Sequence, residues 1–229
     1  MKIKFQILLP LLLALAATFA ASARDRVSIL GDSYSTFKGF VQPESNACWY
    51  FPEPDTTKTD VRSVKQTWWH QLIKEKGWLL EKNNSFSGAT VCTTGYSGKD
   101  FSDRAFTTRV LDLGSPDIIL ILGATNDSWA GAPLGDFKYS DFTEDDLKSF
   151  RPALAYLLET AADRYPNAEI YYMVWDKIKP ELISSAEEIS RHYGIPFLVL
   201  KDIDIKGGHP TIKGMRQIAS QVASLTDGK

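Results

Sequence analysis

Two short polar stretches, far apart in the sequence, hold a serine and a histidine that could act together. Ser33 lies in "VSILGDSYSTF" (residues 27–37), directly after an apolar run, and His209 follows the pair Gly207-Gly208. A serine hydroxyl becomes a nucleophile when a neighbouring histidine takes its proton. Taken singly, Ser33 is also a common turn residue, and His209 could be a simple helix cap. The hypothesis therefore requires that the fold bring the two side chains together.

The other two histidines of the chain have simpler explanations. His70 lies within an amphipathic pattern, where it would pack or face solvent, and His192 comes near the end of a predicted helix, where a positive imidazole suits the helix dipole. His209 instead follows the last apolar run of the chain and precedes Pro210. It is therefore the candidate general base.

Two further stretches could supply hydrogen-bond donors for a developing negative charge. Asn126 lies in "LILGATNDSWAG" (residues 120–131), and its carboxamide could donate to an oxyanion. Gly88 lies in "NNSFSGATV" (residues 83–91), where the missing side chain would let its backbone N–H approach a ligand. Each also fits an ordinary turn.

The elements that must position these residues alternate along the chain. Short apolar runs predict strands over residues 27–30, 78–81, 117–122, 169–175 and 196–200. Helical patterns lie between and after them, over residues 63–77, 102–114, 143–166, 179–194 and 209–225. The continuously apolar "DIILIL" and "PFLVL" are typical of parallel strands covered on both faces. We therefore predict a doubly wound α/β sheet whose site lies at the carboxyl ends of its strands.

Taken together, the four polar stretches resemble the blocks of the SGNH (GDSL-type) hydrolases. "GDS" at 31–33, Gly88 in "SFSGAT", "GATND" at 123–127 and "GHP" at 208–210 occur in the order and spacing of that family, over nearly the whole chain after the N-terminal segment. The resemblance implies a flavodoxin-like three-layer α/β/α sandwich with a five-stranded parallel sheet. It also implies hydrolysis of an ester through an acyl-enzyme, without a metal or organic cofactor.

The resemblance also assigns roles to individual residues. It implies that Ser33 is the nucleophile and His209 the general base. The backbone N–H groups of Ser33 and Gly88 and the side chain of Asn126 would form the oxyanion hole. Asp32, adjacent to the nucleophile, is expected to brace the turn by local hydrogen bonds rather than to act as a triad acid.

One departure from the family concerns the acid behind the base. The family usually has an aspartate three residues before the histidine, and Lys206 stands there in this chain. Asp204 and Asp202 lie five and seven residues before His209. We expect Asp204 to reach the far imidazole nitrogen and stabilise the imidazolium. The alternatives are Asp202, or a backbone carbonyl that leaves a Ser-His dyad.

The first 23 residues have the pattern of an export signal. Lys2 and Lys4 precede an apolar core at residues 8–17, and Ala21-Ser22-Ala23 is a small-x-small cleavage site. The apolar run is too short for a good membrane span, so no stable membrane anchor is expected. The signal predicts a periplasmic or secreted protein, cleaved near Ala23. Residues 24–229 are then expected to form one catalytic domain.

The charge balance and the cysteines limit the possible partners and bonds. The net charge is −2, and it becomes about −4 without the two lysines of the signal. Without a basic tract, nucleic-acid binding is not expected. Cys48 and Cys92 could pair in an oxidising compartment or stay separate thiols. The sequence does not indicate an oligomeric state.

Aromatic residues in the predicted loops bear on the substrate. They are Trp49, Tyr50, Tyr96 and Trp129. Trp129, three residues after Asn126, is the best candidate for a substrate contact. Export and a polar rim favour a glycan ester, with O-acetyl as the acyl group. The alternatives are a lipid ester or thioester, an acyl transferase, and a non-catalytic glycan-binding module on the same fold.

Overall fold

A parallel sheet of five strands forms the centre of the computed structural model, which describes residues 24–227. The strands are β1 (Arg26–Gly31), β2 (Leu79–Asn83), β3 (Ile118–Leu122), β4 (Glu169–Trp175) and β5 (Phe197–Leu200). Their order across the sheet is β2-β1-β3-β4-β5, so the chain moves outward in both directions from β1 and β3. The five strands and the parallel sheet confirm the sequence prediction.

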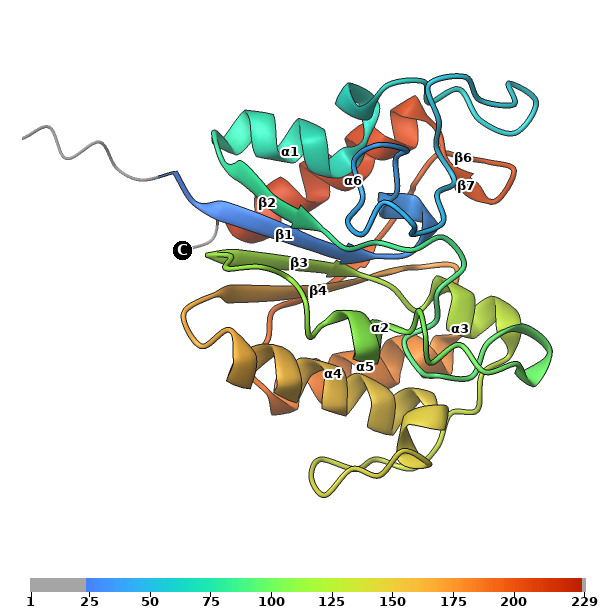
Figure 1. Cartoon of the computed structure of the whole chain (residues 1–229), viewed down its shortest axis with the longest axis vertical. Helices are drawn as coiled ribbons and strands as arrows, with labels where there is room; N and C mark the ends of the chain where they lie inside the picture. Colours follow the sequence, from blue (N-terminus) through green and yellow to red (C-terminus); the bar gives the residue numbers. More distant parts are fainter. Residues whose placement is uncertain (1–23, 228–229) are drawn as a thin grey trace, which may run out of the picture.

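Helices cover both faces of the sheet and complete three layers (Figure 1). On one face lie α1 (Trp68–Lys76) and α6 (Ile212–Thr226), which pack against each other. On the other face lie α2 (Phe106–Arg109), α4 (Phe150–Arg164) and α5 (Pro180–His192). The observed architecture is the predicted α/β/α sandwich.

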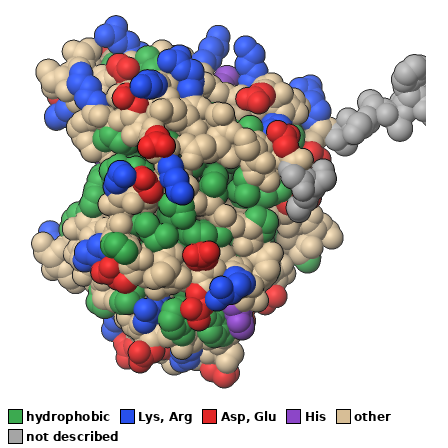
Figure 2. Space-filling model, turned by 180° about the vertical axis from the view of Figure 1, so that it is seen from behind, with side chains coloured by type: hydrophobic (Ala, Val, Ile, Leu, Met, Phe, Trp, Pro, Cys, Tyr) green, Lys and Arg blue, Asp and Glu red, His purple; other side chains and the backbone are tan. Residues whose placement is uncertain are grey.

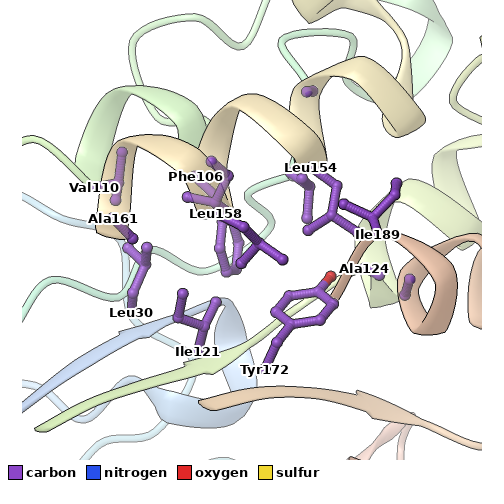
Figure 3. Packing of buried hydrophobic residues seen from close by; sticks show 14 of the residues in the cluster. Leu30, Phe106, Val110, Ile121, Ala124, Leu154, Leu158, Ala161, Tyr172 and Ile189 are labelled. Carbon is purple, nitrogen blue, oxygen red and sulfur yellow. The ribbon is translucent and has the colours of Figure 1, made fainter. Parts of the chain in front are cut away.

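Two hydrophobic cores result, one on each side of the sheet. β3 is buried along its whole length, because its side chains alternate between the two cores. In the core of the second helical layer, Leu30 and Ile121 rise from the sheet towards Phe106, Leu154 and Leu158 (Figure 3). The continuously apolar strands in the sequence reflect this double coverage.

The sequence predicts the end of α1 correctly but not the start of α4. α1 ends at Gly77, whose φ of 71° suits glycine, as predicted. α4 begins at Phe150 and not at Thr143, because Pro152 fits only the first turn of a helix. The hydroxyl of Thr143 instead bonds the carboxylate of Asp146 in a separate turn.

A short hairpin precedes α6 and was not predicted. It pairs β6 (Ile205–Lys206) with β7 (His209–Pro210) in antiparallel fashion. Gly207 and Gly208 form the two-residue turn, with φ angles of 58° and 77°. Such a turn needs a positive φ at both central positions, which explains the glycine pair.

The segment at residues 38–60 forms an ordered loop beside this hairpin. The Tyr50 hydroxyl donates to the Pro210 carbonyl at 2.8 Å, and Lys206 Nζ donates to the Thr56 carbonyl at 2.9 Å. Cys48 and Cys92 are free thiols. No helix within residues 24–227 is long and apolar enough to cross a membrane. On the back of the molecule, hydrophobic side chains gather along the waist between the two helical layers (Figure 2).

Candidate active site

Ser33 lies at the carboxyl end of β1, in the first turn after the strand. Residues Ser33–Ser35 form a single 3₁₀ turn, and Asp32 caps it by accepting the Tyr34 N–H at 3.0 Å. This is the local bracing role expected for Asp32. Ser33 is buried among neighbouring side chains, with 3% of its surface exposed.

The imidazole of His209 meets the Ser33 hydroxyl. The distance from His209 Nε2 to Ser33 Oγ is 2.9 Å, and the distance from Nδ1 to the Gly207 carbonyl oxygen is 3.1 Å. A carbonyl oxygen can only accept, so Nδ1 carries the proton in the neutral ring. Nε2 then presents a lone pair to the serine O–H. Two residues 176 positions apart are thus arranged as a nucleophile and its base.

Asp204 does not take the position behind His209, and the prediction that it orients the ring is wrong. Its carboxylate accepts the hydroxyl of Thr211 instead. The hairpin register explains this, because Lys206 pairs with His209 and Ile205 with Pro210, so that Asp204 lies opposite Thr211. The backbone-carbonyl alternative is the one observed, with Gly207 as the acceptor.

Aromatic rings surround the imidazole on several sides. Trp49 stacks face to face on His209, with ring centroids 3.6 Å apart and planes 7° apart. Tyr34 and Trp129 approach edge-on at centroid distances of 5.5 and 6.1 Å. Burial lowers the pKa of His209 to about 4, against the opposing effect of the Gly207 carbonyl. The base is therefore neutral at neutral pH.

The carboxamide of Asn126 is held in one orientation at the start of α3 (Thr125–Ala130). Its Nδ2 donates to the Ala89 carbonyl at 3.0 Å, and its Oδ1 accepts the Tyr96 hydroxyl at 2.7 Å. An amide nitrogen has two donors, so one N–H remains for a ligand. Sequence reasoning placed Tyr96 at the rim of the site but did not find this orienting contact.

Gly88 belongs to the loop that connects Asn126 with the nucleophile turn. Its φ of 85° lies in the region that favours glycine, and the space where a side chain would stand is open. No acceptor within residues 24–227 takes its N–H. The loop is tied to the nucleophile turn by a bond of 3.1 Å from the Phe86 N–H to the Gly31 carbonyl. These features suit the predicted role as an oxyanion donor.

Two buried carboxyls support the site from beneath. Asp127 accepts the N–H groups of Val91 at 2.8 Å and Cys92 at 3.2 Å, which fastens α3 to the loop of Gly88. Burial raises the pKa of Asp127 to about 6. Burial also raises the pKa of Asp32 to about 7, although the Tyr34 N–H and the charge of Arg109 oppose the shift. The sequence contains Asp127 in "GATND", but no local pattern indicated its function.

Trp129, the predicted substrate contact, lies at the rim beside the base. It is 42% exposed, and the edge of its ring lies 3.4 Å from where a Cβ on Gly208 would stand, which is van der Waals contact. Within the described part of the chain, no cluster of three or more histidine, cysteine, aspartate or glutamate side chains could hold a metal ion.

Comparison with known proteins yields one family and several related structures. The family model of GDSL-like Lipase/Acylhydrolase matches residues 25–226. A crystal structure from Bacteroides ovatus ATCC 8483, provisionally assigned as a GDSL-like lipase, is 55% identical with a TM-score of 0.88; the match covers 90% of this chain and 100% of that one. A counterpart from Bacteroides uniformis ATCC 8492, also provisionally assigned, is 50% identical with a TM-score of 0.89, covering 91% and 98% of the two chains.

More distant structures share the fold. One is an active-site mutant of a family two carbohydrate esterase from Clostridium thermocellum, 15% identical with a TM-score of 0.60. That match covers 90% of this chain and 64% of the other. No curated protein matches the chain.

Proposed function

Because the chain belongs to the GDSL-like lipase/acylhydrolase (SGNH hydrolase) family of ester hydrolases, we propose that it is an exported serine esterase that removes small acyl groups from a carbohydrate. O-acetyl groups are the preferred substrate of this proposal. The main support for the esterase proposal is the distance of 2.9 Å between Ser33 Oγ and His209 Nε2, beside the oriented amide of Asn126.

In the first half of the reaction, the serine is acylated. His209 Nε2 takes the hydroxyl proton while Ser33 Oγ attacks the ester carbonyl carbon, and the electron pair of the C=O bond moves to oxygen. The N–H groups of Ser33, Gly88 and Asn126 donate to this oxyanion. When the tetrahedral intermediate collapses, the C–O bond to the alcohol breaks. The departing alkoxide takes the proton from His209, which leaves an acyl-serine.

In the second half, water replaces serine as the nucleophile. His209 takes a proton from water, the hydroxide oxygen attacks the acyl carbon, and the same donors hold the oxyanion. Collapse releases the carboxylic acid and returns the proton to Ser33 Oγ. The Nδ1–H keeps donating to the Gly207 carbonyl through both halves, which holds the ring in the same tautomer.

The exposed aromatic rim supports a carbohydrate as the alcohol part. Trp129 is 42% exposed and Tyr96 is 36% exposed, and both flank the nucleophile and its donors. Large aromatic surface in contact with solvent beside a reactive group suits stacking on the apolar face of a sugar ring. A long acyl chain would instead need an extended apolar groove.

A covalent serine probe tests the catalytic part of the proposal. A fluorophosphonate should label the protein stoichiometrically, and Ser33→Ala should abolish both the labelling and the hydrolysis of an aryl acetate. Folding of the variant is checked by circular dichroism. A folded wild-type protein that neither reacts with the probe nor hydrolyses aryl acetates would favour the glycan-binding module.

Acetate release from a panel of acetylated polysaccharides tests the substrate. Trp129→Ala should raise KM on an acetylated glycan at least about fivefold, the loss of about 1 kcal/mol of ring stacking, and leave the hydrolysis of a small aryl acetate nearly unchanged. Phe137→Ala is the matched control, because Phe137 is similarly exposed but packs against Arg151 of α4. Faster turnover of long-chain esters than of acetyl glycans would favour the lipid alternative.

A further inference from the structure

The stacked pair of Trp49 and His209 is the feature that the esterase mechanism above leaves unexplained. A carboxylate behind a catalytic histidine performs two tasks, since it fixes the tautomer and it stabilises the positive charge that the ring acquires. The Gly207 carbonyl performs the first task. A neutral carbonyl is much weaker at the second, and Asp204 is engaged by Thr211.

We propose that Trp49 is the positioning residue that performs the second task, by offering its π face to the imidazolium of His209. Centroids 3.6 Å apart and planes 7° apart place the negative face of the indole directly over the ring that becomes positive. Tyr34 and Trp129 lie farther away, at centroid distances of 5.5 and 6.1 Å, and at interplanar angles of 65° and 70°, so neither stacks a parallel ring face on the imidazole. This inference rests on the proposed function.

The backbone holds Trp49 in register with both reacting residues. The Thr36 hydroxyl donates to the Ser33 carbonyl at 3.0 Å and accepts the Trp49 N–H at 2.9 Å. The next residue, Tyr50, donates its hydroxyl to the carbonyl of Pro210, which follows the base. The Thr36 hydroxyl thus links the backbone of Trp49 to the turn of Ser33, and the Tyr50 hydroxyl links the same segment to the hairpin of His209.

The indole is not held in place by a hydrogen bond of its own. Its buried N–H has no partner within the described residues, so the stacking is not a by-product of an N–H contact. The indole of Trp49 excludes water from one face of the His209 ring and places its own π face there. The titratable side chains in ring contact with His209 are the phenols of Tyr34 and Tyr50, both with raised pKa values and therefore neutral. Neither supplies a negative charge to the imidazolium.

Fluorinated tryptophans placed only at position 49 separate this role from packing. Fluorine weakens the negative potential of the ring face and hardly changes its size, whereas a truncation would also let water in. We expect kcat to fall stepwise with each fluorine, by about 5- to 30-fold over the series, the range of a desolvated cation–π contact. Trp49→Phe, which keeps a smaller π face, should lie between wild type and the most fluorinated form.

The pKa of His209, followed by NMR of its ring protons, is a second readout that needs no substrate. It should fall with each added fluorine, because desolvation stays constant and only the stabilisation of the imidazolium is lost. The same series at Trp78 is the control and should change neither quantity, because Trp78 precedes the amino end of β2 whereas Ser33 and His209 meet at the carboxyl end of the parallel β1.

The outcomes distinguish the two proposals. A constant kcat and a constant His209 pKa across the position-49 series would overturn the role of Trp49 and leave the esterase function intact. Absence of any ester hydrolysis by the wild type would overturn the proposed function, while the pKa series would still report whether the indole face stabilises the imidazolium.

Discussion

At the scale of single residues, a triad acid usually performs two tasks, since it fixes the tautomer of the histidine and stabilises its positive charge. In this site, the two tasks are separated. His209 is held in one tautomer by a neutral carbonyl, and burial keeps its pKa low. A base with a low pKa stays unprotonated over a wide range of acidic pH. The geometry therefore favours activity in mildly acidic surroundings.

The pH dependence of kcat/KM should reflect this burial. Because the pKa of His209 is lowered to about 4, the neutral and active form of the base persists as pH falls, and is lost only when pH passes through that value. We expect the acid limb of kcat/KM near pH 4 on an aryl acetate, measured within the range where circular dichroism shows the protein folded. A limb near pH 6.5, the ordinary value for histidine, would contradict the buried base.

Removing the charge of Asp204 should have little effect on catalysis. Its carboxylate accepts the Thr211 hydroxyl at the start of α6 and does not contact His209. Asp204→Asn should keep kcat within about twofold and reduce the free energy of unfolding by about 1 kcal/mol, the difference between a hydrogen bond to a charged acceptor and one to a neutral acceptor. A fall in kcat of about a hundredfold or more would restore Asp204 as the acid behind the base.

These residues also mark the limit of sequence reasoning. Ser33, His209 and Asn126 could be predicted because each follows an apolar strand, and parallel strands end at one edge. The partner of Nδ1 could not, because it is a backbone carbonyl whose position depends on the turn between β6 and β7. The Gly-Gly pair was a visible signal for a two-residue hairpin turn, and it would have indicated the register that separates Asp204 from His209.

At the scale of elements, the proposed oxyanion donors Gly88 and Asn126 belong to two segments that the buried carboxylate of Asp127 fastens together. Asp127 at the start of α3 accepts two N–H groups from the loop after β2. This carboxylate therefore helps to fix the separation of Asn126 and Gly88, together with the bond from Asn126 Nδ2 to the Ala89 carbonyl. A local sequence pattern cannot reveal such a contact between segments 36 residues apart.

Truncating Asp127 should thus affect both stability and turnover. Asp127→Ala leaves two buried N–H groups unpaired, which should lower the free energy of unfolding by about 2–4 kcal/mol. In the folded fraction, kcat should fall about tenfold or more with a smaller change in KM, because a displaced donor weakens binding of the oxyanion more than of the substrate. Asp127→Asn retains an acceptor and should lie between the two. Equal kcat values for all three forms would exclude the positioning role.

At the scale of the whole molecule, the sheet and its cores followed from composition and periodicity, while the long loops did not. Short apolar runs identified all five strands, and the continuously apolar run of β3 reflects the coverage of both its faces. The loop at residues 38–60 has no periodicity, and its contacts with the hairpin arise only in the folded chain. The predicted export signal lies outside the described residues, and its cleavage near Ala23 stays a prediction.

Global stability should depend on pH through the buried Asp32. Its pKa is raised to about 7 in the folded state from 3.8, so between these values the folded state binds the proton and the unfolded state does not. The free energy of unfolding therefore falls as pH rises from about 3.8 to about 7, and it levels off above 7, where the carboxyl is ionised in both states. Asp32→Asn keeps the acceptor for the Tyr34 N–H and cannot ionise. The free energy of unfolding, measured with urea, should decrease less from about pH 5 to about pH 8 in the variant than in the wild type. An equal decrease would mean that a group other than Asp32 causes the pH dependence.

The two-glycine turn has a consequence for how the enzyme would release its product. His209 and the carbonyl that aligns it are two residues apart in one turn, so they move as a unit. A swing of the hairpin away from β1 would lengthen the distance from Nε2 to Ser33 Oγ without releasing the Nδ1 proton. The base would return from each opening already in its working tautomer.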